Sequence, residues 1–274
     1  MFMNLNKSIN VGIIQFDVRV GEVSANQQKV YENIHQLGEK KTNIVVLPEL
    51  WSSGFDPSGI RKYAEKTPEI INDLSKLAIE HHMMIAGSMP EFHNGCVYNT
   101  LYLIDENGAI AGAYRKIHLF PPLGETSCFN PGYRPVVCRT SLGIIGMMIC
   151  YDLRFPELCR SLALQGAQLI VISAQWPATR IDHWDVLLRA RAIENHVFIV
   201  ACNRCGQQEG LLFNGHSQII SPSGKVLAML DHNQGEITAE LDLTEISTVK
   251  TQFDCLSGRV PAAYGLSSQS FDQY

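Results

Sequence analysis

A regular alternation between short apolar runs and amphipathic segments, repeated along most of the chain, constrains the fold more than any other feature. Apolar runs rich in β-branched residues predict buried strands, whereas apolar residues at helical spacing predict helices that cover a sheet. A chain that repeats this order predicts an α/β fold. The predicted strands cover 11–17, 43–47, 83–89, 143–150, 169–173, 197–203 and 236–243, and the predicted helices cover 24–38, 68–82, 156–165 and 183–196. Pro68 and Pro156 are placed at helix starts, where a proline is tolerated.

Two hairpins add antiparallel strands to this pattern. Glu106-Asn107-Gly108 separates two alternating segments, and Asn-Gly tolerates the positive φ that a tight hairpin turn needs. The sequence Ser-Pro-Ser-Gly at 221–224 marks the second hairpin. Because no Pro/Gly/Ser-rich linker or internal repeat interrupts the chain, we expect 1–274 to form a single domain with 247–274 as a C-terminal arm.

The charge balance argues against a nucleic-acid partner. The 274 residues carry a formal net charge of −5, and lysines and arginines are scattered without a basic run. Apolar stretches are too short to cross a bilayer, and the N-terminus lacks a signal-peptide pattern. We therefore expect a cytoplasmic protein with no membrane contact, whose partners are small molecules or another copy of itself.

Eight cysteines in a long chain with a large apolar fraction fit free thiols in a reducing compartment better than a disulfide scaffold. Cys202 and Cys205 form a C-x-x-C motif, but no second C-x-x-C and no histidine pair at ligand spacing accompanies it. We predict no metal site and interpret Cys202 and Cys205 as ordinary thiols at a strand end. A thiol–disulfide function for this pair is the alternative.

Three polar residues directly follow predicted strands, where ligands gather in open α/β sheets. Glu49 follows IVVLP, Lys116 ends the second strand of the first hairpin, and Cys150 ends GIIGMMI. Each has a plain structural alternative: a solvated or helix-capping carboxylate, a surface lysine and a packed thiol. Together they supply a base, a cation and a nucleophile, and the turn after Cys150 resembles a nucleophile elbow whose backbone N–H groups favour a thiolate.

The segments around these residues resemble the three signature segments of the nitrilase (carbon–nitrogen hydrolase) superfamily, in the same order and at similar spacing. They are LPELWSSGF (47–55), YRKIHLF (114–120) and ICYDLRFPEL (149–158). The resemblance continues through 174–204 and 215–228, and so covers nearly the whole chain. It implies an enzyme with a four-layer α-β-β-α sandwich, two copies of which commonly pair through a helix surface.

The resemblance also implies roles for individual residues. Glu49 corresponds to the general base, Lys116 to the oxyanion stabiliser and Cys150 to the nucleophile, with the Tyr151 N–H as a second oxyanion donor. Many members have a further acid after the lysine motif that orients the lysine or the substrate, and Glu125 occupies that place; a solvated loop glutamate is the alternative. The implied reaction hydrolyses a small amide through a Cys150 thioester and needs no metal or organic cofactor.

Within the superfamily, the segments CYDLRFPE, AQWPATRIDHW and ARAIEN are most similar to the omega-amidase-like branch, which acts on dicarboxylic monoamides such as 2-oxoglutaramate. Such a substrate needs a cation for its far carboxylate, and Arg154 and Arg180 are candidates. A structural ion pair of Arg154 with Glu157 or another acid is the alternative that we favour from sequence. Trp176 is a candidate pocket wall or a core tryptophan.

Other readings remain open at the level of sequence. The same triad serves N-carbamoyl amino acid amidohydrolases, deaminated-glutathione amidases, aliphatic amidases and nitrilases, and a nitrilase-fold binding protein is the non-enzyme alternative. His183 and Glu194 are interpreted as supporting or dimer-interface groups. The arm around Arg259 to Tyr264 is expected to reach across the interface of a homodimer or higher homo-oligomer.

Overall fold

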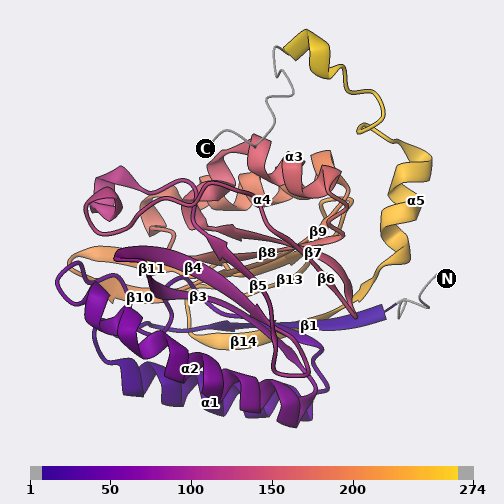
Figure 1. Ribbon diagram of the computed structural model, residues 1–274. Helices are drawn as coiled ribbons and strands as arrows, with labels where there is room; N and C mark the ends of the chain where they lie inside the picture. The colour runs from indigo at the N-terminus through magenta and orange to yellow at the C-terminus, as the bar shows by residue number, and fades with distance from the viewer. Residues whose placement is uncertain (1–7, 265–274) are drawn as a thin grey trace.

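Two six-stranded sheets pack face to face, and a pair of helices covers the outer side of each (Figure 1). The computed structural model describes residues 8–264. Both sheets are mixed, and each contains three adjacent parallel strands flanked by antiparallel ones. The predicted four-layer α-β-β-α sandwich is therefore confirmed.

The first sheet contains the first and the last strand of the fold. Its members are β1 (Ser8–Gln15), β2 (Ile44–Val46), β3 (Met84–His93), β4 (Cys96–Ile104), β5 (Ile110–Arg115) and β14 (Gly235–Asp242), in the order β14-β1-β2-β3-β4-β5. β1, β2 and β3 run parallel, and β14 pairs antiparallel with the whole of β1. The predicted hairpin forms β4 and β5, and Gly108 in its turn has a φ of 81°.

The second sheet repeats this plan with a different set of strands. Its members are β6 (Val137–Thr140), β7 (Gly143–Ile149), β8 (Leu169–Ala174), β9 (Phe198–Asn203), β12 (Gln218–Ile220) and β13 (Val226–Met229), in the order β13-β12-β9-β8-β7-β6. β7, β8 and β9 run parallel. The predicted Ser-Pro-Ser-Gly turn joins β12 to β13. A small hairpin of β10 (Cys205–Gln208) and β11 (Leu211–Asn214) was not predicted.

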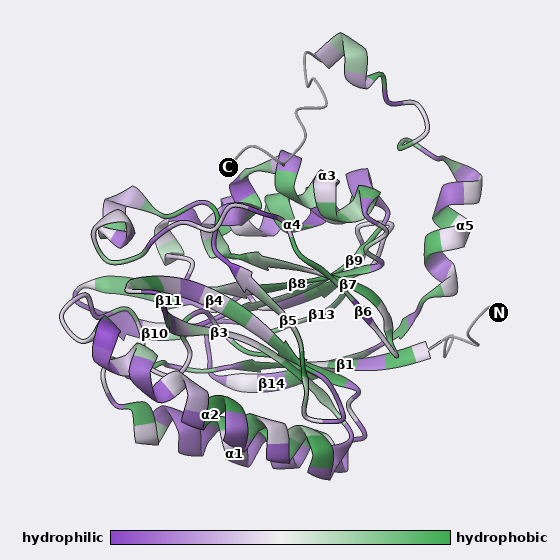
Figure 2. Ribbon diagram, in the orientation of Figure 1, coloured by the Kyte–Doolittle hydropathy of each residue, from purple (hydrophilic) through white to green (hydrophobic). Residues whose placement is uncertain are grey.

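The outer layers consist of two helix pairs. α1 (Val23–Glu39) and α2 (Ile60–His81) cover the first sheet, and α3 (Pro156–Leu164) and α4 (Ile181–Asn195) cover the second. In Figure 2 the ribbons of α1 and α2 alternate between purple and green, as amphipathic helices do, whereas β7 and β8 are mostly green. Helices with one polar face cover strands that are apolar on both faces.

The start of α2 corrects one sequence prediction. We expected a helix over 68–82 opened by Pro68, but α2 begins at Ile60 and Pro68 lies inside it. Buried residues at helical spacing, among them Ala64 and Ile70, continue across the proline. Pro68 faces solvent, where water can satisfy the carbonyl that loses its helical N–H partner. Hydrophobic spacing therefore outweighs the local cost of the proline.

The strands divide their side chains between two cores. In β2, Ile44 and Val46 pack between the two sheets, whereas Val45 packs with Leu47 in the core under α1 and α2. Side chains alternate between the faces of a strand, so a run that is apolar at every position fits a strand buried on both faces. Because β2 and β7 are buried on both faces, the positions of the residues that follow these strands are fixed.

The C-terminal segment leaves the body of the molecule. After β14 the chain forms α5 (Thr244–Gln252) and then a short 3₁₀ turn (Pro261–Tyr264), and both lie away from the sheets in Figure 1. The arm proposed from sequence, 247–274, starts within α5, and its part beyond Tyr264 lies outside the described residues. Within residues 8–264, no helix is long and apolar enough to cross a membrane.

Candidate active site

Strand ends of both sheets bring the three predicted catalytic residues together. Glu49 follows β2, Lys116 follows β5 and Cys150 follows β7. Glu49 and Cys150 line one narrow pocket, and Nζ of Lys116 lies 2.7 Å from Oε1 of Glu49. Glu49 and Lys116 are 67 positions apart along the chain, and Lys116 and Cys150 are 34 positions apart. They meet where parallel strands of both sheets end.

Lys116 is buried between two carboxylates. Its Nζ donates to Oε1 of Glu49 and to Oε1 of Glu125, each at 2.7 Å, and the lysine is 1% exposed. Burial alone would lower the pKa of Lys116, but the charges of Glu125 and Glu49 outweigh burial and hold that pKa well above its ordinary value. The lysine is therefore a fixed cation. An ammonium has three N–H donors, so one donor remains for a further acceptor.

Glu125 is not the solvated loop residue that was the alternative reading. It lies in a 3₁₀ turn (Glu125–Ser127), is 5% exposed, and its second oxygen accepts from the backbone N–H of Phe120 at 2.8 Å. Burial raises the pKa of Glu125, while Lys116 lowers it and Glu49 raises it again. The loop that follows β5 therefore folds back and delivers a second acid to the lysine.

Glu49 is held by donors that sequence reasoning missed. Nδ2 of Asn99 donates to Oε1 of Glu49 at 2.8 Å, and the backbone N–H of Gln175 donates to Oε2 at 2.9 Å. The Gln175 side chain also donates to the Glu49 carbonyl at 2.7 Å. Gln175 follows β8 directly, so its place after a buried strand was a usable signal. Asn99 lies within β4, where only its interruption of an apolar run marks it.

Cys150 sits at a strained strand-to-helix turn. It follows β7, opens a 3₁₀ turn (Cys150–Arg154) and has a φ of 44°, which non-glycine residues rarely adopt. Burial raises the pKa of its thiol well above the ordinary value, and the charge of Glu49 raises it further, although Lys116 lowers it. The thiol is therefore protonated in the resting site, and it needs a base before it can act as a nucleophile.

A buried carboxylate two residues after Cys150 joins the cysteine segment to the lysine segment. Asp152 accepts from the hydroxyl of Tyr114 at 2.7 Å and from the backbone N–H of Ile149 at 2.9 Å. Its other oxygen accepts from the backbone N–H of His118 at 3.0 Å and lies 2.8 Å from Nδ1 of that ring. Tyr114 and His118 flank Lys116, so Asp152 fixes the strand ends that carry the nucleophile and the cation.

The sequence-predicted ion pair of Arg154 with Glu157 is wrong. The Arg154 guanidinium lies 4.5 Å from the centre of the Trp176 ring, and its Nη1 is 3.3 Å from Nδ1 of His183. Stacking on an indole and the exposure of Glu157 at the start of α3 explain why the local pairing is not made. Among residues 8–264, no carboxylate forms an ion pair with Arg154.

Arg154 and Arg180 lie close enough to influence each other. Burial lowers the pKa of Arg154, the positive charge of Arg180 lowers it further, and the Tyr151 and Cys150 groups raise it. Trp176 is buried, and its indole N–H donates to the Arg180 carbonyl at 2.7 Å. Arg154, Trp176 and Arg180 therefore contact one another, although none of them lines the pocket that contains the Cys150 thiol, and Arg180 is exposed. In the described part of the chain neither arginine forms an ion pair.

The pocket beside the thiol is small. Its volume is about 20 Å³, room for little more than one water molecule, and it is lined by residues from the ends of both sheets and from the loop after β5. The lining residues are Glu49, Leu50, Phe55, Phe120, Leu123, Glu125, Cys150 and Gln175. An organic ligand of several heavy atoms requires the aromatic and aliphatic side chains of this wall to move apart.

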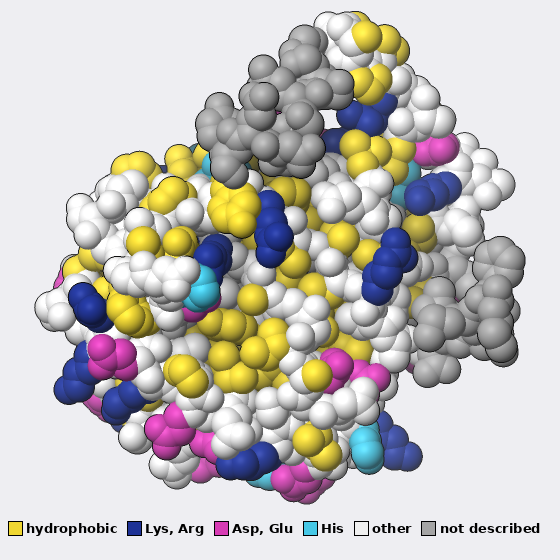
Figure 3. All heavy atoms as spheres, in the orientation of Figure 1, with side chains coloured by type: hydrophobic (Ala, Val, Ile, Leu, Met, Phe, Trp, Pro, Cys, Tyr) yellow, Lys and Arg dark blue, Asp and Glu magenta, His cyan; other side chains and the backbone are white. Residues whose placement is uncertain are grey.

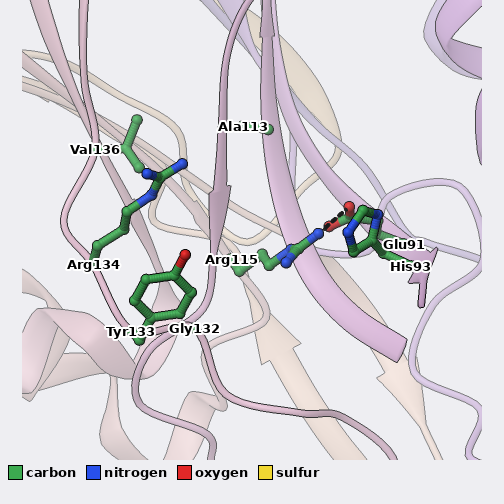
Figure 4. Close-up of a pocket in the computed structure, with 8 residues that line it drawn as sticks. All are labelled: Glu91, His93, Ala113, Arg115, Gly132, Tyr133, Arg134 and Val136. Carbon is green, nitrogen blue, oxygen red and sulfur yellow. Dashed lines mark hydrogen bonds and ion pairs between the residues drawn. The ribbon is translucent and has the colours of Figure 1, made fainter. Parts of the chain in front are cut away.

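A larger surface cavity of about 290 Å³ lies outside this site (Figure 4). Figure 4 shows Arg115 pointing toward Glu91, with which it forms an ion pair at 2.7 Å. The Arg115 guanidinium also lies 4.0 Å from the centre of the Tyr98 ring. Consecutive side chains at a strand end point to opposite sides, so Lys116 points toward Glu49 and Glu125 while Arg115 lines this cavity. The larger cavity contains no group of the triad.

Comparison with known proteins identifies the relatives of this chain. Residues 10–251 match the sequence profile of a family described as carbon–nitrogen hydrolase. The 2-oxoglutaramate amidase of Bacillus subtilis is 38% identical over 242 residues, which cover 88% of this chain and 93% of that protein. The span 10–251 contains the positions of Glu49, Lys116 and Cys150.

Solved structures share the fold. The carbon–nitrogen hydrolase of Helicobacter pylori G27 superimposes with a TM-score of 0.90 at 25% identity, covering 97% of this chain and all of that one. A mutant of the amidase from Nesterenkonia sp. AN1 superimposes with a TM-score of 0.84 at 26% identity, covering 93% and 95% of the two chains. In that structure the acetamide moiety of fluoroacetamide is covalently added at the active-site cysteine.

Proposed function

The chain belongs to the carbon–nitrogen hydrolase family, and on that premise we propose that it hydrolyses the terminal amide of a short dicarboxylic monoamide such as 2-oxoglutaramate. Its general activity is amide hydrolysis. The observation that carries the proposed chemistry is the buried Glu49–Lys116–Glu125 cluster, which lies against the thiol of Cys150. The similarity to the 2-oxoglutaramate amidase supports the choice of substrate.

The first step transfers the thiol proton to Glu49 while sulfur attacks the amide carbon. The pKa of Cys150 is raised by burial and by Glu49, so the thiol does not ionise before substrate arrives. Glu49, a base in the same pocket, accepts the thiol proton as the carbon–sulfur bond forms, so a free thiolate is not required. A tetrahedral oxyanion results, and Glu49 becomes neutral.

Lys116 then stabilises the oxyanion. Two of its N–H donors are held by Glu49 and Glu125, and the third serves the oxyanion together with the Tyr151 N–H. Protonation of Glu49 weakens one of the two ion pairs, so the lysine charge becomes available when the oxyanion needs it. Glu125 keeps the ammonium aimed throughout, because its own place is fixed by the Phe120 N–H.

Ammonia leaves with the proton that Glu49 received, and a thioester to Cys150 remains. Glu49 next takes a proton from a water molecule, which attacks the thioester carbon. The carbon–sulfur bond breaks, the acid product leaves, and Glu49 returns the proton to regenerate the Cys150 thiol. Each proton taken by Glu49 is returned in the same half-reaction. The residues of this chain that we assign to these steps require no cofactor.

Arg154 and Arg180 support a substrate that carries a carboxylate. Arg154 is partly buried, its pKa responds to the charges of Arg180 and Cys150, and in the described structure neither arginine forms an ion pair, so both are available to a substrate anion. A dicarboxylic monoamide supplies that anion at the end of the molecule opposite to its amide. A neutral aliphatic amide or a nitrile does not.

Ammonia release from a matched pair of amides tests this substrate class. We expect succinamate and 2-oxoglutaramate to be hydrolysed with a kcat/KM at least 10-fold above that of butyramide, in which a methyl group replaces the carboxylate. Arg154→Gln should lower kcat/KM for succinamate about 10- to 100-fold and change that for butyramide by less than about 3-fold. Arg139→Gln, which alters an exposed arginine of β6, is the control.

Equal loss on both amides would show that Arg154 supports the site rather than the substrate carboxylate. Faster hydrolysis of N-carbamoyl amino acids, deaminated glutathione or nitriles than of either dicarboxylic monoamide would exclude the proposed substrate class while leaving the amidase chemistry in place.

We further propose that the protein is a homodimer that pairs through α3, α4 and the C-terminal arm. These segments carry a set of large exposed hydrophobic side chains, and a monomer rarely leaves such a set uncovered. The members are Leu164, Val186, Ile193, Phe253, Val260 and Tyr264, which are 48–73% exposed. Light scattering should give twice the 30.5 kDa mass of the chain, and Val186→Glu should shift it toward one copy. A monomer at all concentrations would refute this assembly.

A further inference from the structure

A cluster of two histidines and a glutamate lies between the outer helices of the first sheet. His35 comes from the last turns of α1, and Glu80 and His81 end α2. Nε2 of His81 lies 2.8 Å from Nδ1 of His35, and Oε1 of Glu80 lies 3.7 Å from each of these two nitrogens. Three metal-ligating atoms from two helices therefore converge on one point.

These separations suit a divalent transition-metal ion. Tetrahedral ligands about 2.0–2.1 Å from a zinc ion are separated from one another by about 3.3 Å. The observed separations of 2.8, 3.7 and 3.7 Å lie on both sides of that value. Side-chain shifts of a few tenths of an ångström therefore bring all three atoms to bonding distance, with a fourth position left for water.

His81 is held in the ligating direction by the backbone of α1. A Cβ at Gly38 would lie 2.2 Å from Nδ1 and 2.5 Å from Cγ of His81, so only glycine leaves room for the ring. Glycine inside a helix costs about 1 kcal/mol relative to alanine, and here it admits the imidazole. The rings of His35 and His81 meet edge to face with centroids 4.9 Å apart. The pair is preorganised rather than freely rotating.

The position separates this cluster from the catalytic pocket. α1 leads into β2 and α2 leads into β3. The C-terminal ends of both helices therefore lie near the N-terminal ends of these two strands. Glu49 lies beyond the opposite, C-terminal end of β2. Figure 3 shows acidic and basic side chains with a few histidines along the lower border of the molecule, over the layer of α1 and α2.

We propose that His35, Glu80 and His81 bind one divalent transition-metal ion of the zinc class, which fastens α1 to α2. Imidazole and carboxylate ligands in tetrahedral geometry fit zinc, and cobalt binds the same ligand set. The ion replaces the hydrogen bond between the two rings and balances the Glu80 charge. It is a structural clamp on the helix layer and takes no part in amide hydrolysis.

Equilibrium dialysis of the full-length protein against zinc, followed by metal analysis, tests the site. Wild type should bind one equivalent of zinc. His35→Ala and Glu80→Gln should each bind it with an affinity at least 10-fold lower. His232→Ala, which removes an exposed histidine elsewhere, should bind it as wild type does. Saturating zinc should raise the thermal midpoint of wild type by about 5 °C and that of His35→Ala by much less.

Cobalt distinguishes this cluster from the free thiols of the chain. Bound to His35, Glu80 and His81, cobalt should give visible bands of a tetrahedral site without a sulfur-to-cobalt charge-transfer band. Absence of binding, equal binding by His35→Ala and wild type, or a spectrum dominated by sulfur ligation would each overturn the proposal. None of these results bears on the amidase assignment, which rests on ammonia release.

Discussion

Cys150→Ala should abolish amide hydrolysis while the protein remains folded. Without the thiol no thioester forms, and loss of a nucleophile in a comparable hydrolase lowers kcat by about 10⁶-fold. The substitution removes one sulfur from a site that already has a small pocket, and the strained backbone at φ 44° stays as it is. We therefore expect the free energy of unfolding to change by no more than about 1 kcal/mol.

Ammonia release from succinamate and a denaturant titration measure the two effects separately. Cys96→Ser, which changes a partly buried thiol at the start of β4, serves as the control and should keep full activity. A Cys150→Ala protein that releases ammonia at the rate of wild type would exclude the thioester mechanism.

Glu49→Gln should lower kcat by about 10²- to 10⁴-fold, the range associated with loss of a general base. Glutamine keeps the size of the side chain and an oxygen that can accept from Asn99 or from the Gln175 N–H. Lys116 also keeps its ion pair with Glu125, so the cation remains in place. The loss therefore reports the missing proton acceptor rather than a collapsed site.

The same substitution should lower the pKa of the Cys150 thiol. The charge of Glu49 raises that pKa, so removing the charge favours the thiolate, and Lys116 then lowers the pKa unopposed by Glu49. Alkylation of Cys150 by iodoacetamide should reach half its maximal rate at a lower pH in Glu49→Gln than in wild type. Faster alkylation combined with slower turnover is the distinguishing pattern.

Glu157→Gln provides the matched control, because Glu157 is exposed near the same turn. It should alter neither turnover nor the pH profile of alkylation. If Glu49→Gln retained turnover within about 3-fold of wild type, or raised the pKa of the thiol, another group would have to act as the base.

Local signals predicted most of the fold, and tertiary packing decided the parts that they missed. The Asn107-Gly108 turn and the helix opened by Pro156 depend on backbone preferences of a few residues, and both are confirmed. Pro68 misled because the buried face of α2 extends across it. The β10–β11 hairpin gave no clear alternation, and its first residue, Cys205, pairs through its backbone with the distant Asp17.

The candidate site was predicted in its chemical groups but not in its supports. Glu49 and Cys150 follow buried apolar strands and Lys116 follows the second strand of a hairpin, which are local patterns. Asn99 and Asp152 act through hydrogen bonds to partners many residues away, and no spacing in the sequence reveals such partners. The pairing of Arg154 was misjudged for the same reason, because Trp176 becomes its neighbour only in the folded chain.

The pairing of β1 with β14 sets the order in which this enzyme can mature during its synthesis. β1 leaves the ribosome well before its antiparallel partner, which spans residues 235–242. Until that stretch emerges, one edge of β1 exposes unpaired N–H and C=O groups that another nascent chain can pair with. Chains that stop before residue 235 should therefore depend on chaperones and aggregate without them, although they already contain Glu49, Lys116 and Cys150.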